Sequence, residues 1–207
     1  MSAASHASLA PPRGVPPTMG MWVFIGSELL FFGALLAAYG VARLHWPHGF
    51  GAASRHTDVV LGTLNTAVLL TSSAVIAFAA ACGEQPQQRH RVARLLWITA
   101  TLGCVFMGIK GWEYVKDFRE HLWPGPGFAV QEPGAELFFM LYFFMTALHA
   151  FHLLCGIVTV AVFARGSARR RPWASPTRIE AVALYWHFVD IVWIFLYPFL
   201  YLVERHS

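Results

Sequence analysis

The chain has 207 residues, of which 57% are hydrophobic and only 13% are charged, and its mean hydropathy is +0.51. Soluble domains carry about 25% charged residues, so this composition excludes an ordinary soluble globular fold. The formal net charge is +4. The cations flank apolar segments, where they meet acidic lipid headgroups, and no basic face stands free in water, so we expect no nucleic-acid partner.

Five stretches of the sequence are long and apolar enough to cross a membrane. A hydrocarbon core of about 30 Å needs about 20 mostly apolar residues per helix. The stretches lack the period-2 alternation of an outer-membrane barrel. We therefore predict an all-α integral membrane bundle of five transmembrane helices within residues 19–207, preceded by a flexible, proline-rich segment at residues 1–18. The predicted helices span residues 19–42, 59–82, 92–112, 137–164 and 181–203.

The third predicted helix contains two cations, Arg94 and Lys110. We expect both side chains to snorkel, with the carbon stem along the helix and the charged head at the interface. The three cysteines lie in or at the ends of separate predicted helices, without a CxxC pair, and are expected to be small buried hydrophobes. They are Cys82, Cys104 and Cys155.

The basic residues predict the orientation of the bundle. The N-terminal segment and the second and fourth loops lie on one side of a five-helix bundle. That side carries most of the arginines, whereas the opposite side carries most of the acids. The positive-inside rule then places the N-terminus in the cytoplasm and the C-terminus in the periplasm. The arginines that decide this are Arg13, Arg89, Arg91, Arg94, Arg165, Arg169, Arg170, Arg171 and Arg178.

Five ionisable side chains inside the predicted helices are candidates for a functional site: Glu28, His149, His152, His187 and Asp190. Such groups cost at least a few kcal/mol in a membrane, so they normally face the bundle interior. A rise of about 1.5 Å per residue puts them in the cytoplasmic half or near the midplane. We predict a proton-uptake or structural polar cluster, formed as one hydrogen-bonded group or as several pairs. Mutual pairing that pins two helices together is the simpler explanation for the histidines and Asp190.

The sequence predicts no catalytic residue and no metal site. A di-iron bundle needs Glu-x-x-His on two helices, and copper or zinc needs clusters of cysteine and histidine, neither of which the sequence has. A b-type haem would need His149 or His152 to face His187 across helices. That geometry leaves open one function from a different class, a small haem-bearing quinone oxidoreductase.

The polar residues belong to motifs that resemble subunit III of the haem–copper oxidases. The run Gly20-Met-Trp-Val-Phe-Ile-Gly-Ser-Glu28 resembles its first conserved helix, and Tyr185-Trp-His-Phe-Val-Asp190 resembles its most specific motif. The order and spacing of the motifs hold from about residue 19 to residue 204. The remaining matches are Leu64-Asn65-Thr66, Thr101–Phe106 with Glu113-Tyr114, and Tyr142–Thr146 with His149 and His152–Gly156.

The resemblance implies a non-redox subunit of a proton-pumping terminal oxidase in the bacterial inner membrane. Such a subunit binds catalytic subunit I and other oxidase subunits, carries structural phospholipid, and supports proton uptake and sustained turnover. Haem and copper belong to partner subunits, so no cofactor is expected in this chain. By resemblance, Glu28 is the buried acid of the family, and Asn65, Glu113, Thr146 and Trp186 occupy further motif positions.

The resemblance leaves two alternative functions open, and the sequence departs from the family pattern in two respects. The sequence does not separate a cytochrome c oxidase from a quinol oxidase, or from the related accessory subunit of a nitric oxide reductase, because the electron donor docks elsewhere. The seven-helix form of the family has two more helices at its N-terminus, so a wall of its lipid cleft would have to come here from another subunit. Lys110 stands where glutamine is often found.

Overall fold

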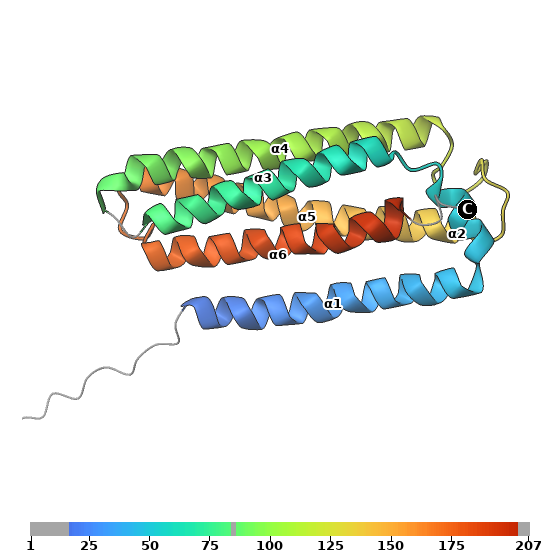
Figure 1. The fold of residues 1–207 in the computed structure, drawn as a ribbon, viewed down its shortest axis with the longest axis horizontal. Coiled ribbons are helices and arrows are strands. Elements are labelled where there is room, and N and C mark those ends of the chain that lie inside the picture. The colour runs from blue at the N-terminus through green and yellow to red at the C-terminus, as the bar shows by residue number, and fades with distance from the viewer. Residues whose placement is uncertain (1–16, 84–85, 203–207) are drawn as a thin grey trace, which may run out of the picture.

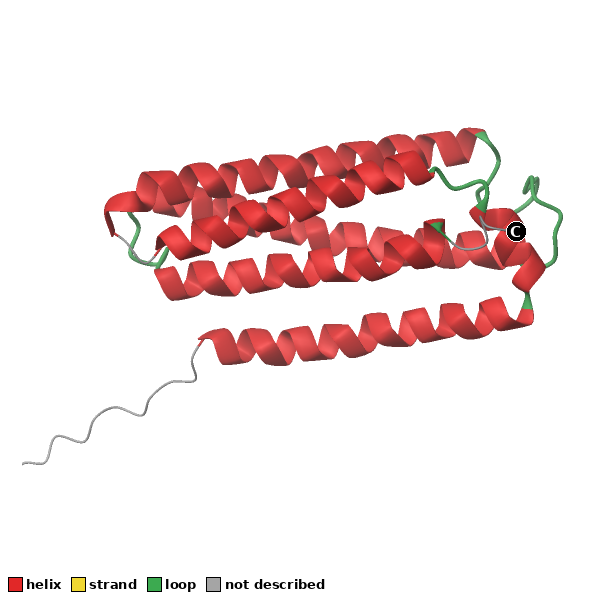
Figure 2. Cartoon of the chain, viewed as in Figure 1, coloured by secondary structure: helices red, strands yellow, loops and turns green. Residues whose placement is uncertain are grey.

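The computed structural model describes residues 17–83 and 86–202, and these residues form helices and connecting loops with no strand (Figure 2). Five of the helices are long and apolar enough to cross a membrane, which confirms the prediction of an all-α protein with five spans. Residues 1–16 of the predicted flexible segment lie outside the described part. The elements are α1 (Pro17–His45), α2 (Pro47–Ser54), α3 (Val59–Gly83), the 3-10 helix η1 (Pro86–Gln88), α4 (Arg89–Arg119), α5 (Ala135–Ala168) and α6 (Pro176–Tyr201).

Helices α3 to α6 pack as a four-helix group, and α1 lies alongside α6 and also touches α5 (Figure 1). The inner face of α1 alternates steps of four and three residues, the spacing of a left-handed helix pair. This face includes Met21, Ile25, Glu28, Phe32 and Tyr39, and the last two are buried. Most of the remaining surface of α1 is exposed in this chain.

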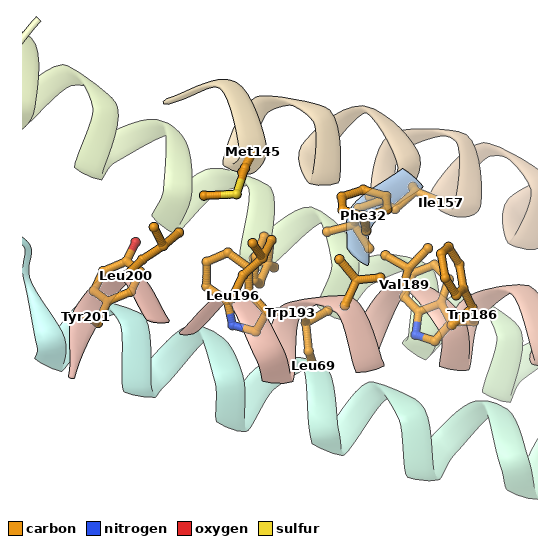
Figure 3. Close-up of a cluster of buried hydrophobic side chains, with 14 of the residues drawn as sticks. Phe32, Leu69, Met145, Ile157, Trp186, Val189, Trp193, Leu196, Leu200 and Tyr201 are labelled. Carbon is orange, nitrogen blue, oxygen red and sulfur yellow. The ribbon is translucent and has the colours of Figure 1, made fainter. Parts of the chain in front are cut away.

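Trp186 of α6 joins the four packed helices. Its side chain is fully buried, and its indole N–H donates a 3.0 Å hydrogen bond to Ser72 Oγ on α3. Two glycines make room for the ring: a Cβ on Gly103 of α4 would lie 2.8 Å from it, and one on Gly156 of α5 would lie 3.3 Å from it. Figure 3 shows Trp186 in the row of buried side chains that continues along α6 to Trp193.

The short helix α2 covers one end of the bundle, in the connection between the predicted helices at residues 19–42 and 59–82 (Figure 1). Pro47 is at the first turn of α2, a position that proline favours because its missing N–H has no intrahelical partner there. Phe50 is fully buried. Gly49 lies so close to the loop before α5 that an added Cβ would come within 2.0 Å of the Pro133 carbonyl oxygen. Half of this connection, Pro47–Ser54, is therefore a packed helix.

Candidate functional site

A buried charged cluster lies on one face of α4. Lys110, Glu113 and Asp117 are spaced three and four residues apart, so they share that face, and their side chains are 3%, 1% and 4% exposed. Lys110 Nζ lies 3.1 Å from Glu113 Oε2. The prediction that Lys110 snorkels to the interface is wrong, because its ammonium group is enclosed by protein and paired inside the bundle.

Two tyrosines from other helices complete this cluster. Tyr142 of α5 accepts a 2.8 Å hydrogen bond from Lys110 Nζ and donates to Glu113 Oε1 at 2.8 Å. Tyr201, the last residue of α6, donates to the same carboxylate oxygen at 2.6 Å and also accepts from Lys110. The Tyr142 hydroxyl lies 3.4 Å from Asp117 Oδ2. We call these five residues the Lys110 cluster.

The Lys110 cluster ties three helices together by charge and by aromatic contact. The ammonium nitrogen lies 4.7 Å from the centroid of the Tyr142 ring and 5.1 Å from that of Tyr201, within the range of cation–π attraction. One ammonium faces two carboxyl groups, so the cluster is electrically neutral when one carboxyl carries a proton. Buried charges are tolerated only when paired and hydrogen-bonded in this way.

A second, exposed ion pair lies just beyond the Lys110 cluster. Lys116 Nζ is 3.1 Å from Asp58 Oδ2, and Asp58 Oδ1 accepts hydrogen bonds from the backbone N–H groups of Val60 and Leu61 at the start of α3. Partial burial acts to raise the pKa of Asp58. The hydrogen bonds from Lys116 and from the two N–H groups outweigh burial and hold the pKa below its ordinary value. Asp58 is therefore a charged N-terminal cap.

Glu28 and His152, two of the predicted site residues, are brought together by the packing of α1 on α5. Glu28 Oε2 lies 3.3 Å from His152 Nε2 without meeting hydrogen-bond geometry, and the side chains are 21% and 14% exposed. His152 Nδ1 lies 2.9 Å from the Leu148 carbonyl oxygen, which can only accept, so Nδ1 carries a hydrogen. A favourable contact between Nε2 and the carboxyl group then needs one further proton, on either partner.

An apolar cavity of about 460 Å³ borders His152 of this pair, between α1, α5 and α6. His152 forms part of its wall, and the Tyr185 hydroxyl donates a 2.9 Å hydrogen bond to the His152 carbonyl oxygen. The cavity is large enough for part of a hydrocarbon chain and presents little polar surface. Its other wall residues include Met21, Phe24, Phe151 and Val182.

The other three predicted residues do not join Glu28 and His152. His187 Nδ1 pairs with Ser73 Oγ at 2.6 Å. Asp190 is buried, and neither of its carboxyl oxygens meets hydrogen-bond geometry with a described residue. His149 lies with its ring centroid 5.7 Å from that of Phe106 and 5.2 Å from that of Trp193. Neither of its nitrogens is hydrogen-bonded within the part of the chain that the structure describes. In the described part of the chain the five residues thus form separate groups, not one hydrogen-bonded cluster.

Two further motif positions, Thr146 and Asn65, lie inside the bundle. Thr146 Oγ1 lies 2.6 Å from the Tyr114 hydroxyl and donates to the Tyr142 carbonyl oxygen, beside the Lys110 cluster. Asn65 is buried, and its side-chain amide has no hydrogen-bond partner among residues 17–83 and 86–202. The prediction of buried cysteines is wrong for Cys104 and Cys155, which are exposed on this chain. Among residues 17–83 and 86–202 no group of three or more histidine, cysteine, aspartate or glutamate side chains is placed to hold a metal ion.

The sequence contained a signal for three of the five residues of the Lys110 cluster. Lys110, Glu113 and Asp117 occur at i, i+3 and i+7, which places one cation and two acids on one helix face. No comparable signal places Tyr142 and Tyr201 against Lys110, because tyrosines are common at membrane interfaces. Their role depends on how α5 and α6 pack against α4.

Comparison with known proteins gives consistent matches. Residues 8–204 match the sequence model of the family described as cytochrome c oxidase subunit III. The chain is 30% identical to cytochrome c oxidase subunit 3 of Thermostichus vulcanus, over 98% of this chain and 94% of the relative. It is also 30% identical to the protein of that name from Corynebacterium diphtheriae, over 98% of this chain and 99% of the relative. A probable quinol oxidase subunit 3 of Staphylococcus epidermidis is 27% identical, over 89% and 88%.

Proposed function

Since this chain belongs to the cytochrome c oxidase subunit III family, we propose that it is the non-redox subunit III of a proton-pumping terminal oxidase in a bacterial inner membrane. In this role it stabilises catalytic subunit I and supports proton uptake and sustained turnover. Haem and copper reside in partner subunits. The observation that carries the proposal is the 3.3 Å contact between Glu28 of α1 and His152 of α5, which unites two positions of the family motifs.

The Glu28–His152 pair supports both halves of this role. A carboxyl group and an imidazole that share one proton can hold that proton at membrane depth and pass it on. The same contact fastens α1 to the four-helix group. The neighbouring apolar cavity of about 460 Å³ is suited to the acyl chain of a structural phospholipid.

We infer cytochrome c as the electron donor of the complex. The two relatives that match this chain over 94% and 99% of their own lengths are both named as subunits of cytochrome c oxidases. A subunit of a quinol oxidase is the second candidate, favoured by the 27% identical relative from Staphylococcus. The donor of the purified complex distinguishes the two, because only a cytochrome c oxidase oxidises reduced cytochrome c.

We further propose that the arginine-rich end of the bundle faces the cytoplasm, as the positive-inside rule requires. The starts of α4 and α6 and the end of α5 gather at this end, together with the start of α1 (Figure 1). In a variant without its three native cysteines, a cysteine replacing Glu132 should react with a membrane-impermeant thiol reagent applied from the periplasm. A cysteine replacing His90, at the opposite end, should react only after the membrane is opened. The reverse labelling pattern would show that the orientation is wrong.

The test of the proposed function is purification of the tagged chain from its native membrane. A haem-bearing catalytic subunit should co-purify with it in equal amount, and the complex should consume oxygen. A chain that purifies alone, or that itself shows a haem spectrum, would contradict the proposal.

Two substitutions at Glu28 then separate the two roles of the Glu28–His152 pair. Glu28→Gln keeps the size and polarity of the side chain but cannot hold a titrating proton, whereas Glu28→Ala also removes the contact with His152. We expect Glu28→Ala to reduce the co-purifying catalytic subunit or to shorten the working life of the oxidase. Slower proton uptake by Glu28→Gln, with assembly unchanged, supports the proton-holding role. Both variants behaving as wild type would leave Glu28 without either role.

A further inference from the structure

Four helix ends enclose a small cavity at the arginine-rich end of the bundle. α3 ends there at Gly83 and α4 begins at Arg89, while Ser167 lies at the end of α5 and Pro176 at the start of α6. The cavity has a volume of about 40 Å³. This is more than one water molecule needs, and is sufficient for a small ion. Val92, Ala174 and Ile179 form the rest of its wall.

The wall of this cavity contains a buried hydroxyl group without a partner. Ser167 is 2% exposed, and its Oγ has no hydrogen-bond partner in the described chain. Its backbone does not share this property, because the Ser167 carbonyl oxygen accepts a 3.2 Å hydrogen bond from the N–H of Arg170. Buried hydroxyl groups in folded proteins are almost always hydrogen-bonded, so the Ser167 side chain indicates a small polar ligand in the cavity.

The charge of the surroundings decides which ligand fits. Arg89 is half-buried on the cavity wall, and within the described residues it makes no ion pair. The positive ends of α4 and α6 and the negative ends of α3 and α5 all meet here, so their dipoles largely cancel. The side chains therefore set the sign of the potential. The sequence places eight arginines at this end of the bundle, Arg89, Arg91, Arg94, Arg165, Arg169, Arg170, Arg171 and Arg178, against only two acids, Glu84 and Glu180.

We propose that this cavity binds a small inorganic anion of the size and charge of chloride. The Arg89 guanidinium group supplies the charge, and the Ser167 hydroxyl donates a hydrogen bond to the ion. Both groups are donors, so together they prefer an anion to a cation, and the unpaired positive charge favours an anion over water. The bound ion would link the starts of α4 and α6 to the end of α5. Neither Arg89 nor Ser167 makes this link without the ion.

The test compares chloride with a larger anion on the purified complex that contains the full chain. The complex is prepared in sodium gluconate and heated in sodium gluconate or sodium chloride at equal ionic strength, and the temperature at which half of this subunit is lost from the soluble fraction is measured. Ligand binding to the folded state raises that temperature, and we expect a rise of about 3–6 °C in chloride. Ser167→Ala and Arg89→Gln should each remove most of the rise.

The matched control is Arg91→Gln, which removes an exposed arginine from the first turn of the same helix. It should keep the full chloride effect. Equal effects in all three variants would show a general salt effect and overturn the proposal, as would a wild-type protein indifferent to chloride, whose cavity then holds water. A chloride effect that appears only in Glu84→Gln would assign the cavity to a carboxylate of the chain itself, which also overturns it.

Discussion

Replacing Lys110 by methionine is expected to destabilise the subunit by about 3–5 kcal/mol, because Glu113 and Asp117 would remain buried without their cation. Lys110 is 3% exposed, and it hydrogen-bonds to Glu113, Tyr142 and Tyr201. Whole domains are stable by only about 5–15 kcal/mol. Such a loss should therefore sharply lower the amount of folded chain in the membrane, measured by quantitative immunoblot and by thermal unfolding of the purified complex.

The matched control for Lys110 is Lys116→Met on the same helix. Lys116 also pairs with a carboxylate at 3.1 Å, but the two side chains are 42% and 26% exposed, and exposed pairs contribute at most about 1 kcal/mol. Adding Glu113→Gln to Lys110→Met should restore part of the loss, because the double change removes both charges of the pair. Equal losses for Lys110→Met and Lys116→Met would contradict the assignment of Lys110 as the buried counter-charge.

Replacing Trp186 by alanine is expected to cost about 3–5 kcal/mol, the range for a buried aromatic side chain. The ring fills the space between Gly103 and Gly156, and its N–H holds Ser72, so the change removes contacts with three helices at once. Trp186→Phe keeps much of the volume and loses one hydrogen bond, at about 1 kcal/mol. Thermal unfolding of the purified complex measures both changes.

Trp112→Ala provides the comparison for Trp186. It makes the same chemical change at a tryptophan that is 68% exposed on α4. We expect a small effect on unfolding, because no cavity forms inside the bundle. If the two alanine variants unfold at the same temperature, Trp186 does not have the central packing role assigned to it.

The five spans could be predicted from sequence because the requirement for a span is local. About 20 apolar residues in a row suffice to cross the hydrocarbon core, whatever the helix packs against. The partners of each helix are not local. Glu28 and His152 each stood out as ionisable residues in an apolar segment, but only the packing of α1 on α5 brings their side chains to 3.3 Å. His187 has the same signal in the sequence and pairs with Ser73 instead.

The Lys110 cluster shows why hydropathy alone misplaces a charge. The ammonium group of a lysine near the end of an apolar segment can be stabilised in two ways, by reaching the membrane interface or by pairing with an acid inside the bundle. We predicted that Lys110 reaches the interface and that the helix ends at residue 112. In the structure α4 continues to Arg119, and Glu113 and Asp117 are buried on the same face as Lys110. The spacing of Lys110, Glu113 and Asp117 along α4 favours the buried pair. That spacing gives no information on the two tyrosines that enclose the ammonium group, because they belong to α5 and α6.

The arrangement of the Lys110 cluster has a consequence for membrane insertion during synthesis. Chains fold from the N-terminus as they are made, so α4 reaches the lipid before Tyr142 and Tyr201, which belong to α5 and α6. Lys110 and Glu113 are one helical turn apart and 3.1 Å from each other. They therefore neutralise each other on the inserting helix itself, so α4 need not carry Lys110 as an uncompensated charge into the bilayer while it waits for the later helices.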